Sequence, residues 1–144
     1  YRRVTPYLVL VGAAEAIEFY AKIFGAVETV RMPGPGGRIA HAEIKIGDSV
    51  VMLADENPDA PWHGPRSMGG SPVSLVLYVE NVDDTVARAV AAGAKLVRPV
   101  ENQFYGDRTG GLEDPFGHQW HIATHIEDVT PDEMRRRMAA MQGK

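Results

Sequence analysis

The sequence predicts an α+β fold in which one strand–helix–three-strand unit occurs twice. The first observation is a repeated order of landmarks: Thr5-Pro6 returns as Ser71-Pro72, and Gly25-Ala26 returns as Gly93-Ala94. The second is that each half closes with a glycine followed by an apolar strand, at Gly47 and again at Gly117. The third is size and composition, because 144 residues of which 44% are hydrophobic can build one core.

Each element follows from its periodicity. In the first half we expect a strand up to Val11 and a helix over 13–24, whose apolar residues recur at helical spacing. Strands over 38–46 and 49–54 follow, since Ile44, Ile46, Val51 and Leu53 alternate with other residues. The second half repeats this order with a strand over 73–79, a helix over 82–92, a strand from Lys95 and a strand over 119–124.

The expected organisation is a single domain over 1–144. The first unit covers about 4–56 and the second about 73–126. Between them, 57–72 is a linker rich in Pro and Gly, in which we expect no regular element. Thr130-Pro131 starts an amphipathic helix over about 130–141, because Pro is favoured in the first helical turn. We expect that helix to pack on the body or on a partner.

Composition excludes several classes of function. Fifteen Lys and Arg against nineteen Asp and Glu give a net charge of −4, so nucleic acid is not an expected partner. The longest apolar run, Tyr7 to Val11, is far shorter than the roughly 20 residues that cross a bilayer, so we expect no membrane association and a cytoplasmic location. Because the chain contains no Cys, any metal would need His, Asp, Glu or water as ligands.

Two segments carry a resemblance to a known family. Residues 10–26, with Phe19-Tyr20 ahead of Gly25, and Asp114 to Trp120 resemble the opening and the closing strand of the vicinal oxygen chelate superfamily. That superfamily contains glyoxalase I, the bleomycin and fosfomycin resistance proteins and the extradiol dioxygenases. The similarity extends from Thr5 to His125, and residues 105–108 further resemble a glyoxalase-like bacterial branch. It implies tandem βαβββ modules in a glyoxalase-like open barrel, and a homodimer.

The resemblance also implies positions for four metal ligands, one on the first and one on the last strand of each unit. Carried over to this sequence, they are Thr5, Met52 (or Val51 if the register slips), Ser74 and His121. Only His121 is a usual ligand for a divalent metal. We therefore expect no metal at the standard places and no cofactor, with a divalent metal held by His41, Glu43 and His121 as the alternative.

Strand alternation predicts which side chains line the cup between the modules. Trp120 and Ile122 should face the core, which turns His121 to the other face. In the strand over 38–46 the set Ala40, Ala42, Ile44 and Ile46 should face the core, so that His41 and Glu43 share the concave face. The same reasoning adds Tyr7, Val76 and Tyr78, which would give a mostly apolar small-molecule site.

Arg108 is a candidate for binding an anionic group of the ligand, with a structural ion pair beside Asp107 as the other interpretation.

Two functions follow from these residues. The first is a binding protein of the bleomycin-resistance type that holds a small, partly aromatic organic molecule and does not turn it over. The ligand would contact Thr5, Tyr7, His41, Met52, Ser74, Val76, Tyr78 and Arg108. The alternative is a metal-dependent lyase, isomerase or dioxygenase-like enzyme in which His121 and Glu43 are catalytic and act with His41. This alternative requires those three side chains to converge on one ion.

Overall fold

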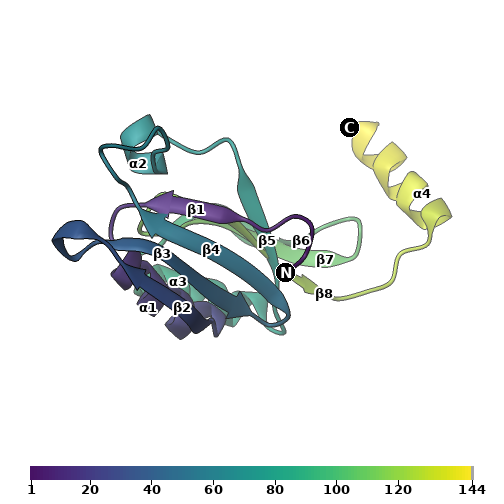
Figure 1. Ribbon diagram of the computed structural model, residues 1–144. Helices are drawn as coiled ribbons and strands as arrows, with labels where there is room; N and C mark the ends of the chain where they lie inside the picture. The colour runs from purple at the N-terminus through teal and green to yellow at the C-terminus, as the bar shows by residue number, and fades with distance from the viewer. Residues whose placement is uncertain (144) are drawn as a thin grey trace.

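The computed structural model describes residues 1–143 and contains two four-stranded sheets, with no closed barrel among the described residues (Figure 1). The first half supplies β1 (Tyr7–Leu10), α1 (Ala13–Phe24), β2 (Val27–Pro33), β3 (Ile39–Ile46) and β4 (Ser49–Asp55). The second half supplies β5 (Ser74–Tyr78), α3 (Val82–Ala91), β6 (Lys95–Asn102), β7 (Asp107–Glu113) and β8 (Gln119–His125). The predicted α+β class is confirmed.

The two sheets have the same topology. Their strand orders are β1-β4-β3-β2 and β5-β8-β7-β6, and in each the first strand of the unit runs parallel to the last. Tyr7 pairs with Met52 in the first sheet, as Val76 pairs with His121 in the second. These registers make Tyr7 equivalent to Val76, and Met52 equivalent to His121.

The helix predicted over 13–24 is α1, and it ends at Gly25, which adopts a left-handed conformation (φ 70°) that a residue without a Cβ takes easily. The linker differs from its prediction, because it contains a short helix, α2 (Pro65–Met68). Pro65 fixes the φ angle of the first turn and left-handed Gly69 ends it. A 3₁₀ turn, η1 (Pro35–Gly37), connects β2 to β3.

The last strand of each unit also holds the start of that unit's helix. In the first unit, Oδ1 of Asp55 accepts hydrogen bonds from the backbone N–H groups of Gly12 (2.9 Å) and Ala13 (2.8 Å). In the second, Oγ1 of Thr124 accepts from the N–H of Val82 at 2.9 Å. In both units a side-chain oxygen on the last strand thus accepts from backbone N–H groups at the start of the helix, which have no partner within the helix.

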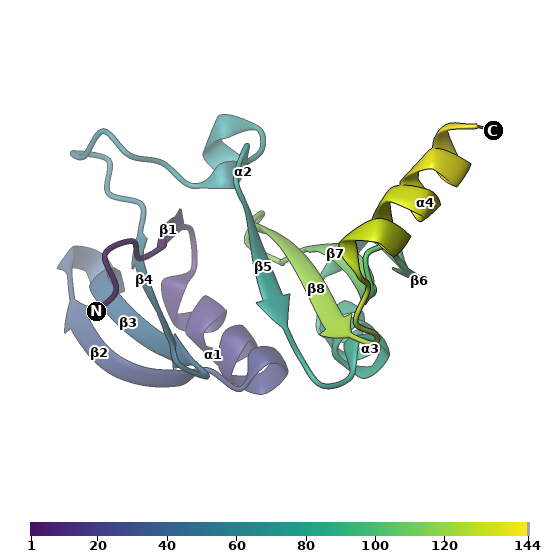
Figure 2. The same cartoon turned by 90° about the vertical axis from the view of Figure 1, so that its right-hand side faces the viewer.

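The helices join the two halves into one core. Figure 2 shows α1 on the side of the first sheet that faces the second half of the chain. From α1, the rings of Tyr20 and Phe24 lie 5.5 and 4.6 Å, centroid to centroid, from Trp120 of β8. Buried Asp114 completes the contact by accepting hydrogen bonds from Tyr20 Oη (2.5 Å) and Trp120 Nε1 (2.9 Å). One face of each sheet is therefore covered by core and helix, and the other is open.

The predicted core face of β3 is wrong at one end. Ala42, Ile44 and Ile46 are buried as predicted, but Ala40 is exposed and Ile39 is buried. The cause is an irregular register, in which Met32 pairs with His41 while Pro33 pairs with Ile39. Ala40 is the extra residue of this bulge, so the alternation of faces is interrupted there.

The C-terminal helix α4 (Pro131–Gln142) projects from the body and buries none of its residues in the described chain (Figures 1 and 2). It is tethered through Arg137, whose guanidinium donates to the carbonyl of Phe104 (2.9 Å) and to Glu127 (2.6 Å). Among residues 1–143, no helix combines the length and the hydropathy needed to span a bilayer.

Candidate functional site

The open face of the second sheet forms a cavity of about 700 Å³, which we name the second-sheet cup. It is lined by Val76, Tyr78, Arg98, Pro99, Glu101, Gln103, Tyr105, Asp107, Thr109, Gly110, Gly111, His121 and Ala123. Val76, Tyr78 and His121, which the sequence analysis placed in a cup, all belong to this set. Val76 and Tyr78 are each 61% exposed, so their apolar surface is available to a ligand.

Strand registers order the cup into rows. One row runs Arg98, Gly111, His121, Val76 across β6, β7, β8 and β5. The next contains Glu101, Thr109, Ala123 and Tyr78. Odd-numbered residues of β7 therefore point into the cup, which places Asp107 there as well.

Asp107 is 5% exposed and lies at the centre of a hydrogen-bonded network. Tyr78 Oη donates to its Oδ2 at 2.7 Å, and His125 Nδ1 donates to its Oδ1 at 2.9 Å. The second ring nitrogen of His125 lies 2.7 Å from Asp128 Oδ1. Because both ring nitrogens face carboxylates, the network favours the cationic form of His125 over the neutral form, and Asp107 has its partners within the protein.

These contacts shift two pKa values in opposite directions. Burial opposes ionisation of Asp107, but the hydrogen bonds from Tyr78 and His125 outweigh it and lower its pKa below 3.8. The hydrogen bond to Asp107, and then the bond to Asp128, raise the pKa of His125 above 6.5. The ion pair of Asp107 and His125 therefore stabilises the fold at pH values between the lowered pKa of Asp107 and the raised pKa of His125. The stabilisation is lost as pH falls through the first of these or rises through the second.

We therefore predict that the ring protons of His125 titrate above pH 6.5 in the folded protein. Replacement of Asp128 by asparagine should move that midpoint down, because one of the two carboxylates that hold the charge is removed. Proton–carbon NMR spectra recorded across the pH range measure both midpoints. A midpoint for His125 at or below 6.5 would contradict the network.

Neither Asp107 nor His125 has this role in the sequence-based prediction, in which Asp107 enters only as the neighbour of Arg108 and His125 has no assigned function. The signal that could have found them is strand pairing, because Asp107 lies opposite His125 in the β7–β8 register.

Arg108 lies outside the cup, contrary to its predicted ligand-binding role. Its guanidinium bonds to both carboxylate oxygens of Asp83 (2.8 and 2.9 Å), at the start of α3, and to Oδ1 of Asn102. Its even position on β7 turns it to the helix-covered side of the sheet. The structure shows the ion pair, with Asp83 as the partner in place of Asp107.

The open face of the first sheet carries Tyr7, His41, Glu43 and Met52, which we name the first-sheet face. His41 Nε2 lies 2.8 Å from Oε2 of buried Glu43, and its Nδ1 lies 2.8 Å from Tyr7 Oη. Hydrogen bonds from Tyr1 and then His41 lower the pKa of Glu43, so the ionised carboxylate accepts a hydrogen bond from the Nε2–H of His41, and Nδ1 accepts one from the Tyr7 hydroxyl. None of these residues lines the second-sheet cup.

The predicted single cup is therefore divided between two faces. Thr5 precedes β1 and is not part of that strand, while Ser74 lies on β5 but does not line the second-sheet cup. The alternative triple is also separated, because His41 and Glu43 bond to each other on the first sheet and His121 lies on the second. Among residues 1–143, no three or more His, Asp or Glu side chains gather in a group that could hold a metal ion.

The positions carried over from the superfamily do not fit a divalent metal either. They offer one imidazole, at His121, together with a thioether at Met52 and two hydroxyls. Thioether sulfur is a soft donor, whereas divalent metal sites in proteins are built mainly from imidazole and carboxylate ligands.

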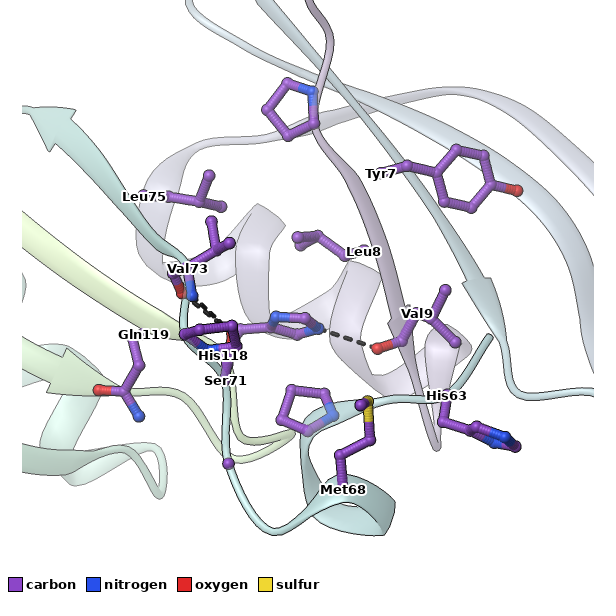
Figure 3. Close-up of a pocket in the computed structure, with 14 residues that line it drawn as sticks. Tyr7, Leu8, Val9, His63, Met68, Ser71, Val73, Leu75, His118 and Gln119 are labelled. Atoms are coloured by element: carbon purple, nitrogen blue, oxygen red, sulfur yellow. Dashed lines mark hydrogen bonds between the residues drawn. The ribbon is translucent and has the colours of Figure 1, made fainter. Parts of the chain in front are cut away.

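A smaller hollow, of about 270 Å³, lies where the two halves meet (Figure 3). Residues of β1, β5 and the linker line it, and His118 crosses one side to donate from Nε2 to the carbonyl of Val9 at 2.9 Å. Figure 3 also shows Ser71 at the end of the linker, close to Val73; the Ser71 hydroxyl donates to the carbonyl of Val73. The bond from His118 to Val9 joins the second half of the chain to the first across this hollow.

Comparisons with known proteins agree with this architecture. The family model described as the glyoxalase/bleomycin resistance protein/dioxygenase superfamily matches residues 8–122. An uncharacterised protein of Mycobacterium bovis is 42% identical over 140 residues, covering 95% of this chain and 92% of that protein.

Two solved structures show the same fold. The crystal structure of TioX from Micromonospora sp. ML1 has a TM-score of 0.65 at 25% identity, covering 90% of this chain and all of TioX. The fosfomycin resistance protein FosX from Listeria monocytogenes, in complex with Mn(II) and sulfate, has a TM-score of 0.63 at 13% identity, covering 92% and 95%.

Proposed function

The chain belongs to the glyoxalase/bleomycin resistance protein/dioxygenase superfamily, and from this premise we propose that it binds a small, partly aromatic organic molecule in the second-sheet cup. The observation that carries the proposal is the cup itself. It has a volume of about 700 Å³, within the usual range for small-molecule sites, and it combines exposed Val76 and Tyr78 with several polar and charged side chains.

The proposal includes binding without a resident metal ion. Its support is the set of residues at the four metal-ligand positions that the superfamily implies, because His121 is the one usual ligand for a divalent metal among them. The alternative, an enzyme that acts through His121 with His41 and Glu43, would require side chains that lie on two separate sheets of one chain.

We also propose that the protein is a homodimer in which a second copy covers the open side of the cup. Members of the superfamily often form dimers. Exposed apolar side chains on both open faces support this, including Tyr7 at 47% and Tyr78 at 61%. Sedimentation equilibrium measures the mass directly, and a single-chain mass at micromolar concentrations would contradict the proposal.

The experiment that tests ligand binding is NMR mapping. We would titrate the protein, in the presence and absence of EDTA, with a panel of one- and two-ring aromatic compounds and record backbone amide spectra. Shifts confined to Val76, Tyr78, Gly111 and His121, unchanged by EDTA, are the expected result. Shifts elsewhere, or shifts abolished by EDTA, would overturn the site or its independence of metal, respectively.

A further inference from the structure

The second-sheet cup contains one arginine, Arg98, whose charge is not paired with a carboxylate among the described residues. Arg98 lines the cup, is exposed, and forms no ion pair with any residue among 1–143. Two other arginines in the second half of the chain differ in this respect. Arg108 is bound to Asp83 and Arg137 to Glu127 and Glu133. Arg98 is thus the guanidinium of the cup that remains available to a ligand.

A glycine shapes the space beside Arg98. Gly111 lies between Arg98 and His121 in the same row, and a Cβ at position 111 would lie 3.1 Å from Cβ and 3.4 Å from Cγ of Arg98. The aliphatic stem of Arg98 therefore lies against the bare glycine on the cup side. With strands about 4.8 Å apart, Arg98 and His121 stand about 10 Å apart at their Cα atoms, with no side chain between them.

These positions suit a planar anion. A guanidinium presents paired N–H donors that match the two oxygens of a carboxylate, and the imidazole of His121 adds a donor from the opposite side. The next row, with Tyr78, and the nearby ring of Tyr105 supply aromatic surface for the rest of the molecule. We propose that the ligand is an aromatic carboxylic acid whose carboxylate lies over Gly111 between Arg98 and His121. This inference rests on the proposed function.

The other charges of the cup limit the ligand to a single negative charge. Glu101 lies one row from Arg98 on the same strand and forms no ion pair within residues 1–143. Asp107 is balanced by His125. A phosphate dianion would therefore bring two negative charges to a cup with one free cation and one free anion, whereas the single charge of a carboxylate is matched by Arg98 alone.

The test compares acids with neutral molecules of the same shape. Benzoate, 1-naphthoate and indole-3-acetate are titrated against the full chain beside their carboxamides, with dissociation constants from calorimetry and site assignment from amide NMR shifts. We expect each acid to bind at least about tenfold more tightly than its amide, as a charge-assisted pair does. The Arg98→Gln variant should abolish this preference, and Arg98→Lys should restore part of it.

Two variants serve as controls. Lys95→Gln removes a positive charge from the same strand outside the cup and should leave the acid preference unchanged. Glu101→Gln should leave the preference for acids unchanged or increase it, because this variant removes a negative charge near the site. Equal binding of acids and amides at the cup would overturn the carboxylate inference and leave the proposed function standing. Shifts at no cup residue with either series would overturn both.

Discussion

Replacing Asp114 by alanine is expected to lower the free energy of unfolding by about 3–5 kcal/mol. Asp114 is 2% exposed, and its carboxylate accepts four hydrogen bonds. Oδ2 accepts from the side chains of Tyr20 and Trp120, and Oδ1 accepts from the backbone N–H groups of Phe116 (2.9 Å) and His118 (3.0 Å). Alanine would leave these buried donors without partners, and each such group costs about 1–3 kcal/mol.

The loss should be cooperative across the whole chain, because Tyr20 belongs to the first half and Asp114 to the second. Urea denaturation followed by Trp fluorescence measures it. Tyr20→Phe is the matched variant, since it removes one of the four hydrogen bonds and should cost about 1–1.5 kcal/mol. If Asp114→Ala cost no more than Tyr20→Phe, the carboxylate would not be the junction between the halves.

Replacing Tyr78 by alanine is expected to weaken binding of an aromatic ligand by about 10-fold to 100-fold, which corresponds to about 1.4–2.8 kcal/mol of lost apolar contact. The ring lines the second-sheet cup, and its hydroxyl donates to Asp107. Tyr78→Phe keeps the ring and removes only the hydroxyl, so its affinity should stay within about threefold of the unmodified protein.

Calorimetric titration with 1-naphthoate measures both variants. Val97→Ala is the control for nonspecific loss of apolar surface, because Val97 is 52% exposed on β6 and does not line the cup. Equal weakening by Tyr78→Phe and Tyr78→Ala would show that the hydroxyl network, and not the ring, governs binding. No effect of either variant would remove Tyr78 from the site.

Much of the fold could be predicted because it depends on local signals. The periodicity of residues 13–24 and the glycine that follows them define α1 to the residue, since amphipathic spacing and a left-handed cap are properties of the segment itself. Prediction failed where a local irregularity changed the face of a residue. The bulge that exposes Ala40 and buries Ile39 arises from the pairing of β2 with β3, which the alternation in β3 alone does not contain.

The candidate site was less predictable, because its residues come together across strands. His125 bonds to Asp107 and Asp128, while Arg108 is bound by Asp83, which lies 25 residues earlier on α3. The role that we propose for Arg98 likewise could not be predicted from the residues around it in the sequence. It depends on the space left by Gly111, which lies on the neighbouring strand.

The sequence by itself determined the duplicated strand–helix–three-strand units and the family, because periodicity, capping glycines and the Asp114–Gly117 turn are encoded within short segments. Only the tertiary structure decided that Tyr7, His41 and Glu43 belong to one open face and that Val76, Tyr78 and His121 belong to another. The physical reason is that strand alternation fixes which face of its own sheet a side chain occupies. How the two sheets are placed depends on long-range packing, in which Tyr20, Asp114 and Trp120 join α1 to β8.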